Sequence, residues 1–129
     1  MAGRVYLYLP IIAILFGLGG CEDIFVENIS DDLVQTITPV NNAELKVGTV
    51  SFVWEELYGA EDYRVVIVSP SFSNIQNYVC DSILTGQRMD IVLLMPDMYE
   101  WSIEARNFGY KSLKTISKFG LVSESIDTP

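Results

Sequence analysis

Tyr99-Glu-Trp-Ser-Ile-Glu-Ala105 is the stretch that decides the fold class of this chain. Its apolar residues occupy every second position, and polar residues occupy the positions between them. Successive side chains of a β-strand point to opposite faces, so this alternation predicts a strand with one buried face and one solvated face. The same pattern recurs at residues 50–54 and 63–67, where aromatic and branched side chains again share one face.

Shorter runs of the same kind predict the rest of a β-structure. We expect further strands at residues 35–38, 78–84, 89–94 and 115–122. Asparagine, glycine and proline separate these runs, and the longest predicted connection is the loop at residues 70–77. There is no helical stretch of the kind that a βαβ unit needs. The sequence therefore predicts an all-β fold, a seven-stranded antiparallel β-sandwich.

Two segments carry a resemblance to a known family. Trp54, Gly59-Ala60 and Tyr63, followed by Leu94-Met-Pro-Asp-Met-Tyr-Glu-Trp-Ser-Ile-Glu-Ala-Arg-Asn107, resemble a fibronectin type III domain, which is immunoglobulin-like. The resemblance covers residues 35–122 and implies that Trp54 packs in the core. The spacing from Leu94 to Tyr99 is one residue shorter than usual, so it leaves open whether the tyrosine-corner hydrogen bond forms.

The first 20 residues have the composition of a secretory signal. Arg4 precedes an apolar run with no charge from Val5 to Gly20, and small residues close the run. The alternative is a transmembrane helix, but a span needs about 20 apolar residues. The apolar core here covers residues 5–18 and contains Pro10. We therefore expect residues 1–20 to be a cleaved signal peptide.

Leu18-Gly19-Gly20-Cys21 resembles the lipobox of bacterial lipoproteins. The resemblance implies that Cys21 is acylated, becomes the first residue of the mature protein and anchors it to a membrane. The alternative is a chance match at the end of an ordinary signal. The mature chain would hold all 17 acidic residues and 7 of the 8 basic ones, so its formal charge would be −10. This charge excludes nucleic acid as an expected partner, because phosphate binding needs a basic surface.

Residues 21–34 are acidic with scattered apolar residues, and we expect them to be a lipidated tether. Glu22 and Asp23, with Glu27 close behind, resemble the export tether of Bacteroidota-type surface lipoproteins. That resemblance implies display on the outer face of the outer membrane. The alternative is a solvated linker in a protein that faces the periplasm. After the sandwich at residues 35–122, we expect residues 123–129 to be a flexible C-terminal tail.

The residue inventory argues against catalysis. The chain has no histidine, which is the commonest general base and metal ligand, and no Gly-x-Ser-x-Gly motif. Cys80 lies in an apolar run, so we expect a buried, inert thiol. The acid pairs Glu55-Glu56 and Glu61-Asp62 flank one predicted turn and are typical of a solvated surface. Calcium is an alternative there, although no known calcium loop has this spacing. We expect no enzyme activity, no cofactor and no metal site.

Aromatic residues in predicted loops are the candidates for ligand binding. Phe108 and Tyr110 flank Gly109 in one turn, and Phe72 lies between serines in the predicted 70–77 loop. Strand periodicity requires none of them, and loop aromatics often anchor binding surfaces. The alternative is that they cap the ends of the sandwich. We therefore expect a non-catalytic binding or recognition module for a glycan or a polypeptide. The second hypothesis is an accessory docking spacer in an envelope complex, and fold alone does not choose between them.

Overall fold

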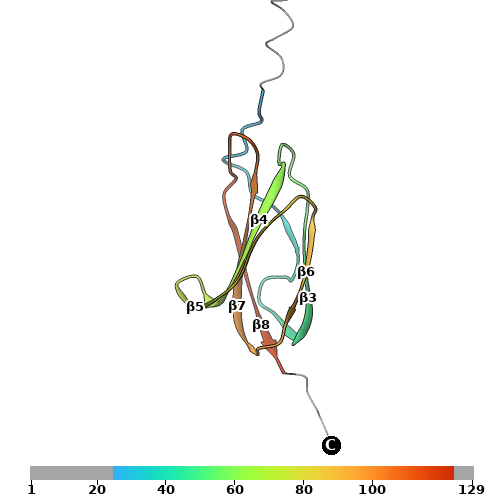
Figure 1. The fold of residues 1–129 in the computed structure, drawn as a ribbon, viewed down its shortest axis with the longest axis vertical. Helices are drawn as coiled ribbons and strands as arrows, with labels where there is room; N and C mark the ends of the chain where they lie inside the picture. The colour runs from blue at the N-terminus through green and yellow to red at the C-terminus, as the bar shows by residue number, and fades with distance from the viewer. Residues whose placement is uncertain (1–24, 124–129) are drawn as a thin grey trace, which may run out of the picture.

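The computed structural model describes residues 25–123, and within this range eight strands form two packed sheets (Figure 1). The strands are β1 (Thr36–Thr38), β2 (Ala43–Lys46), β3 (Gly48–Trp54), β4 (Asp62–Ser71), β5 (Asn74–Leu84), β6 (Arg88–Leu93), β7 (Asp97–Arg106) and β8 (Thr115–Val122). One sheet has the order β1-β3-β6, and the other has the order β2-β8-β7-β4-β5. The all-β sandwich predicted from the sequence is confirmed.

Each strand predicted from the sequence is present, and β2 is an addition. This strand has four residues and pairs in parallel with β8, whereas the other pairings are antiparallel. Its pairing extends the larger sheet at the edge opposite β5. The sequence pattern missed β2 because a run as short as Ala-Glu-Leu-Lys has little periodicity to detect.

The core lies between the inner faces of the two sheets and is rich in aromatic rings. Phe52 of the smaller sheet meets Trp101 of the larger sheet edge to face, with ring centroids 4.9 Å apart. Tyr99 stacks on Phe119 at 5.3 Å, and Trp54 is fully buried. The apolar residues of the 99–105 stretch thus pack inward as the sequence predicted. The predicted solvated face is wrong at Ser102 and Glu104, which are only 4% and 6% exposed.

The packed domain begins earlier than residue 35. Ile29 and Val34 are 0% and 1% exposed and belong to the core, although the sequence assigned residues 21–34 to a tether. Backbone bonds fix this segment: the amide of Leu113 donates to the carbonyl of Asp32 at 3.0 Å. The hydroxyl of Thr115 donates to the carbonyl of Val34 at 2.7 Å. We call residues 25–34 the strap, because they run across one end of the sandwich.

The tyrosine corner forms despite the shortened turn. The hydroxyl of Tyr99 donates a hydrogen bond of 2.6 Å to the carbonyl of Met95, four residues upstream. Burial and then the charge of Asp97 raise the pKa of Tyr99, so the phenol remains a neutral donor at physiological pH. The shorter spacing therefore changes the length of the turn and keeps its hydrogen bond.

Several predictions concern residues outside 25–123. The signal peptide, the acylated Cys21, and the export residues Glu22 and Asp23 lie there, as does the tail after Ser123. Across the part of the chain that is described, no helix has the length and apolar character required to cross a membrane.

Candidate functional site

Phe108 and Tyr110 project from the loop between β7 and β8. Asn107 shapes this loop, because its side-chain oxygen accepts hydrogen bonds from the amides of Gly109 and Tyr110 at 3.0 and 2.8 Å. The ring of Phe108 is 89% exposed, whereas that of Tyr110 is 37% exposed. The structure thus keeps the two residues at one end of the sandwich, with Phe108 as the more available ring.

The side-chain amide of Asn107 also joins this loop to two neighbouring segments. It donates to the carbonyl of Glu27 in the strap at 2.8 Å and to the carbonyl of Gly59 in the β3–β4 loop at 3.0 Å. Gly59 has a φ of +92°, and a Cβ atom there would lie 2.9 Å from the side chain of Glu27. The strap, the β3–β4 loop and the β7–β8 loop therefore meet in close contact. Because of this close approach and the positive φ, only glycine suits position 59.

This meeting point exposes two further aromatic rings that the sequence did not single out. Phe25 of the strap is 84% exposed, and Tyr58 of the β3–β4 loop is 82% exposed. Both line a hollow of about 320 Å³ together with Glu27, Glu61 and other loop residues. We call this end of the domain, marked by Phe25, Tyr58 and Phe108, the aromatic end. Tyr58 lies in a turn between strands, where strand periodicity does not require an aromatic residue. This position in a turn is the sequence signal that could have identified Tyr58.

Phe72 lies elsewhere, and the predicted 70–77 loop is mostly strand. β4 extends to Ser71 and β5 begins at Asn74, so Phe72 and Ser73 form a tight hairpin turn. The amide of Phe72 donates to the carboxylate of Glu100 at 2.7 Å, and its side chain is half-buried. Because β4 begins near the aromatic end and runs ten residues away from it, Phe72 shares no surface with Phe108.

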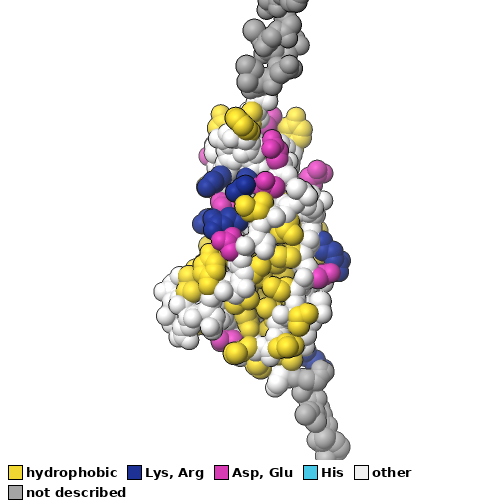
Figure 2. Space-filling view, viewed as in Figure 1, with side chains coloured by type: hydrophobic (Ala, Val, Ile, Leu, Met, Phe, Trp, Pro, Cys, Tyr) yellow, Lys and Arg dark blue, Asp and Glu magenta, His cyan; other side chains and the backbone are white. Residues whose placement is uncertain are grey.

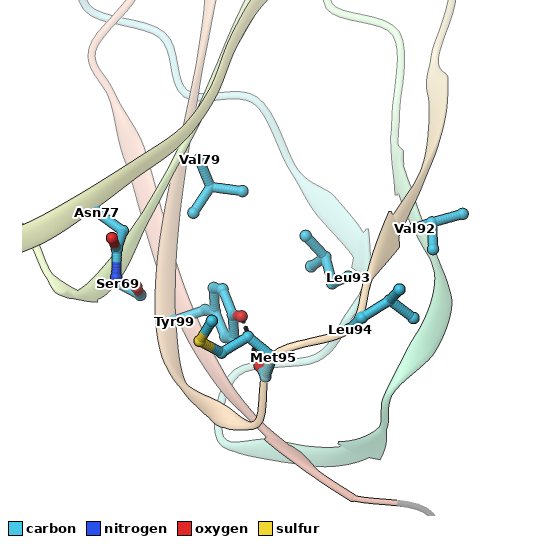
Figure 3. Close-up of a pocket in the computed structure, with 8 residues that line it drawn as sticks. All are labelled: Ser69, Asn77, Val79, Val92, Leu93, Leu94, Met95 and Tyr99. Carbon is cyan, nitrogen blue, oxygen red and sulfur yellow. Dashed lines mark hydrogen bonds between the residues drawn. The ribbon is translucent and has the colours of Figure 1, made fainter.

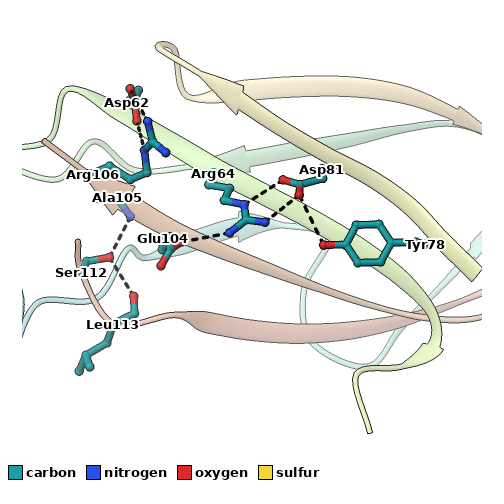
Figure 4. A network of polar contacts seen from close by, with 9 residues as sticks. All are labelled: Asp62, Arg64, Tyr78, Asp81, Glu104, Ala105, Arg106, Ser112 and Leu113. Carbon is teal, nitrogen blue, oxygen red and sulfur yellow. Dashed lines mark hydrogen bonds and ion pairs between the residues drawn. The ribbon is translucent and has the colours of Figure 1, made fainter. Parts of the chain in front are cut away.

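The structure places the members of the acid pairs Glu55-Glu56 and Glu61-Asp62 in different surroundings (Figure 4). Asp62 forms an ion pair with Arg106 at 2.8 Å, whereas Glu55, Glu56 and Glu61 are exposed. Within residues 25–123, no cluster of three or more His, Cys, Asp or Glu side chains has an arrangement that could hold a metal ion.

A second polar group lies on the outer face of the larger sheet. Arg64 donates two hydrogen bonds to Asp81, at 2.9 and 2.7 Å, and lies 4.0 Å from the buried carboxylate of Glu104 (Figure 4). The hydrogen bond from Arg64 holds the pKa of Asp81 below its ordinary value. These carboxylates are engaged by a guanidinium, so their arrangement suits a structural ion pair better than acid–base chemistry.

Cys80 is half-buried rather than buried. It faces the core from β5, and its sulfur lies 3.4 Å from the hydroxyl of Ser82. β5 is the edge strand of the larger sheet, so it leaves part of its inward face uncovered. The apolar run around Cys80 gave no sign of this edge position.

An apolar trough occupies the open side of the sandwich between β5 and β6. Tyr99, Ser69 and Leu93 are buried at its floor, whereas Leu94 and Met95 are 70% and 62% exposed at its rim. Figure 3 shows Leu93 pointing across the space toward Val79 of β5. The hollow measures about 200 Å³ and is lined by Ser69, Asn77, Val79, Val92, Leu93, Leu94, Met95 and Tyr99. Four separate segments build it, so no single sequence motif announces it.

Comparison with solved structures identifies the architecture. The domain is similar to the fibronectin type III domain of the human collagen alpha-1(XX) chain, with 16% identity and a TM-score of 0.56. The alignment covers 74% of this chain and 92% of that domain. The chain has a fibronectin type III fold. The domain of human fibronectin type III domain containing protein 3 is also similar, with 13% identity, a TM-score of 0.51 and coverage of 76% and 92%.

These likenesses establish the fold alone. No protein-family model matches the sequence, and no curated protein matches it either. In this fibronectin type III-like domain the Trp54 and Tyr63 of the sequence resemblance are both buried, with ring centroids 5.7 Å apart. The aromatic end and the trough are features of this chain's own loops and edges, and any role for them follows from their geometry.

Proposed function

We propose that this chain is a lipoprotein, acylated at Cys21, that holds a non-catalytic binding module on the outer membrane. The Leu18-Gly19-Gly20-Cys21 box and the short apolar run before it support the anchor. The fibronectin type III-like fold supports the module, because such domains generally serve in binding and scaffolding. Several acyl chains on one residue suffice for stable anchoring.

The ligand that best fits the module is an extended polypeptide segment lying in the trough. The observation that carries this proposal is an apolar floor between two free strand edges. β5 and β6 each end a sheet, so within residues 25–123 neither has a partner strand on its outer side. Their free amides and carbonyls can pair with an added strand, whose alternate side chains would reach Leu93 and Val79.

The size of the trough argues for side chains rather than for a whole small molecule. Pockets for drug-sized ligands measure about 300–1,000 Å³ and bury most of the ligand. The trough measures about 200 Å³ and is open to solvent at Leu94 and Met95. A polypeptide fits such a shallow site because its backbone bonds to the strand edge and only a few side chains need to be buried.

In-cell photo-crosslinking tests this surface. A photoreactive amino acid replaces Leu94 in the trough or, as a matched control, Ile116, which is 55% exposed on another face. A partner captured at residue 94 and not at residue 116 is identified, and a peptide from its crosslinked segment is titrated into the protein. Leu94→Asp should weaken this binding, and Ile116→Asp should not.

Hydrogen exchange distinguishes strand addition from other modes of contact. The bound peptide should slow exchange at the outward amides of β5 or β6, because these amides gain a hydrogen-bond partner. Binding that leaves both edges exchanging as before would show that the trough is not extended by a strand. A ligand identified as a glycan would also contradict the polypeptide proposal.

The anchor and its membrane face need separate measurements. Mass spectrometry of the mature N-terminus should find an acylated Cys21, and Cys21→Ser should abolish partitioning into membranes. For display on the cell surface, protease added to intact cells should remove the domain. Replacement of Glu22, Asp23 and Glu27 by alanine should protect it. Protection of the wild-type protein would place the domain on the periplasmic side.

The second candidate function is a docking spacer in an envelope complex. The observation that favours it is the elongated shape of the domain, with the strap at one end and the end of β8 at the other (Figure 1). Such a module could hold two partners apart. Co-purification with an envelope assembly, together with failure of the isolated module to bind a free ligand, would favour the spacer over the recognition module.

A further inference from the structure

The aromatic end presents large apolar rings to solvent. Phe25, Tyr58 and Phe108 are 84%, 82% and 89% exposed, which makes them the most exposed large hydrophobic residues among residues 25–123. Figure 2 shows hydrophobic side chains at the end of the domain where the grey N-terminal segment begins. Several exposed rings at one end require an explanation that single exposed apolar residues do not.

These rings are held on a rigid base. The side chain of Asn107 bonds to both the strap and the β3–β4 loop, at 2.8 and 3.0 Å. The loop that carries Phe108 also lies beside the strap, since a Cβ atom added at Gly109 would come within 3.8 Å of the side chain of Val26. Ile29 anchors the strap in the core. The three segments that carry the rings are therefore joined to one another and, through Ile29, to the core.

The position of Phe25 in the sequence limits its distance from the proposed anchor. Phe25 is the fourth residue after Cys21. Whatever its conformation, a chain of this length spans no more than about 14 Å. The inference rests on the acylation of Cys21 proposed above. With acyl chains on Cys21, the backbone of Phe25 at the aromatic end is held within that distance of the lipid surface.

We infer that the aromatic end rests on the lipid surface of the membrane that holds the anchor. Tyrosine rings are favoured at the boundary between headgroups and acyl chains, where the ring leaves water and the hydroxyl remains solvated. Phenylalanine side chains on an apolar surface next to polar groups bury at the same boundary. Contacts made by the rings add a second point of attachment to the acyl chains. The domain would then stand on the membrane in one orientation.

The acidic residues around the hollow limit how deeply the rings enter the membrane and determine which lipid headgroups the aromatic end prefers. Glu27 and Glu61 line the hollow between the rings, and a carboxylate placed in the hydrocarbon core is costly. The rings therefore contact the headgroup region and do not enter the acyl interior. The same carboxylates are repelled by anionic headgroups. The lipid surface that fits this end is zwitterionic.

Fluorescence quenching in vesicles tests the inference with the mature, acylated protein. Cys80→Ser removes the half-buried thiol, and a single reporter cysteine replaces either Glu56, beside the aromatic end, or Ser73, in the β4–β5 turn. Each cysteine carries an environment-sensitive fluorophore, and the vesicles are phosphatidylcholine with a nitroxide-labelled lipid. The label at residue 56 should be quenched and shifted to the blue, and the label at residue 73 should stay in water.

A triple variant shows whether the rings cause the contact. Phe25→Ser, Tyr58→Ser and Phe108→Ser together should abolish the quenching at residue 56, while the acylated protein still floats with the vesicles. The matched control, Val40→Ser, Ile75→Ser and Met98→Ser, replaces three other exposed apolar residues that lie away from this end and outside the trough. That variant should keep the quenching. Vesicles rich in phosphatidylglycerol should reduce the quenching in the wild-type protein.

The outcomes separate this inference from the proposed function. An acylated protein that floats with the vesicles but keeps residue 56 in water, or that is quenched equally in the triple variant, overturns the inference and leaves the anchor intact. If the label at residue 56 leaves water in outer-membrane preparations but not on pure vesicles, the aromatic end binds a glycan or a protein. That result also overturns the inference. A mature protein without acylation overturns the proposed anchor and the inference together.

Discussion

Ile29→Ala should destabilise the domain strongly, although the residue lies in a segment that reads as a linker. The side chain is 0% exposed and packs in the core. The substitution removes three carbon groups at about 0.8 kcal/mol each, or about 2.4 kcal/mol. The cavity that remains adds to this, so we expect a loss of about 3 kcal/mol, within the usual range for buried isoleucine. That is a large part of the about 5–15 kcal/mol that stabilises a typical domain.

Urea unfolding of the chain from residue 22, followed by the fluorescence of Trp54 and Trp101, measures this loss. With a slope of about 1.5 kcal/mol per molar urea, the midpoint should fall by about 2 M. The matched control is Leu33→Ala in the same strap, where the side chain is 46% exposed and the cost should be about 1 kcal/mol or less. An unchanged midpoint for Ile29→Ala, or equal shifts for both variants, would refute the packing of the strap.

Three further predictions concern the core, the corner and the ion pair. Trp54→Ala should cost about 3–5 kcal/mol in the same urea assay, while a chelator should leave wild-type stability unchanged. Tyr99→Phe should cost about 1 kcal/mol, because the carbonyl of Met95 loses its bond from the hydroxyl; a neutral substitution would show that this bond contributes nothing. Arg64 lowers the pKa of Asp81 in the folded state, so the pair stabilises the protein above the unfolded pKa and this contribution disappears as pH falls through the folded pKa. Between about pH 5 and about pH 2, wild type should therefore lose slightly more stability than Asp81→Asn, and identical losses would contradict the pair's role.

The sequence predicts the fold well because period-2 alternation shows which face of a strand is apolar and packs into the core. The stretch 99–105 alternates without interruption, and its apolar members are at most 3% exposed. The alternation fails where burial comes from contacts outside the strand itself. Ile29 is buried by crossing the end of the sandwich, and a single apolar residue in an acidic segment has no period to detect. Strand β2 is too short to show one.

The candidate site was predictable only in part. Phe108 and Tyr110 are recognisable in the sequence as candidate binding residues, because a turn around Gly109 does not itself require two aromatic side chains. Their neighbours at the aromatic end come from segments about 50 and 80 residues away, and only the fold brings them together. The trough depends on β5 and β6 lying at the edges of two different sheets, which is a property of topology rather than of any local pattern.

The two proposed surfaces can be occupied at the same time, because they lie far apart on one domain. β4 connects them: Asp62 lies beside the aromatic end, and Ser69 lies at the floor of the trough. Seven steps along a strand cover about 23 Å. If the aromatic end rests on lipid, the trough stands clear of the headgroups and its free edges face outward. A polypeptide partner could then bind without displacing the membrane contact. Loss of the rings should therefore change how the module is oriented while leaving the affinity of the trough for its peptide unchanged.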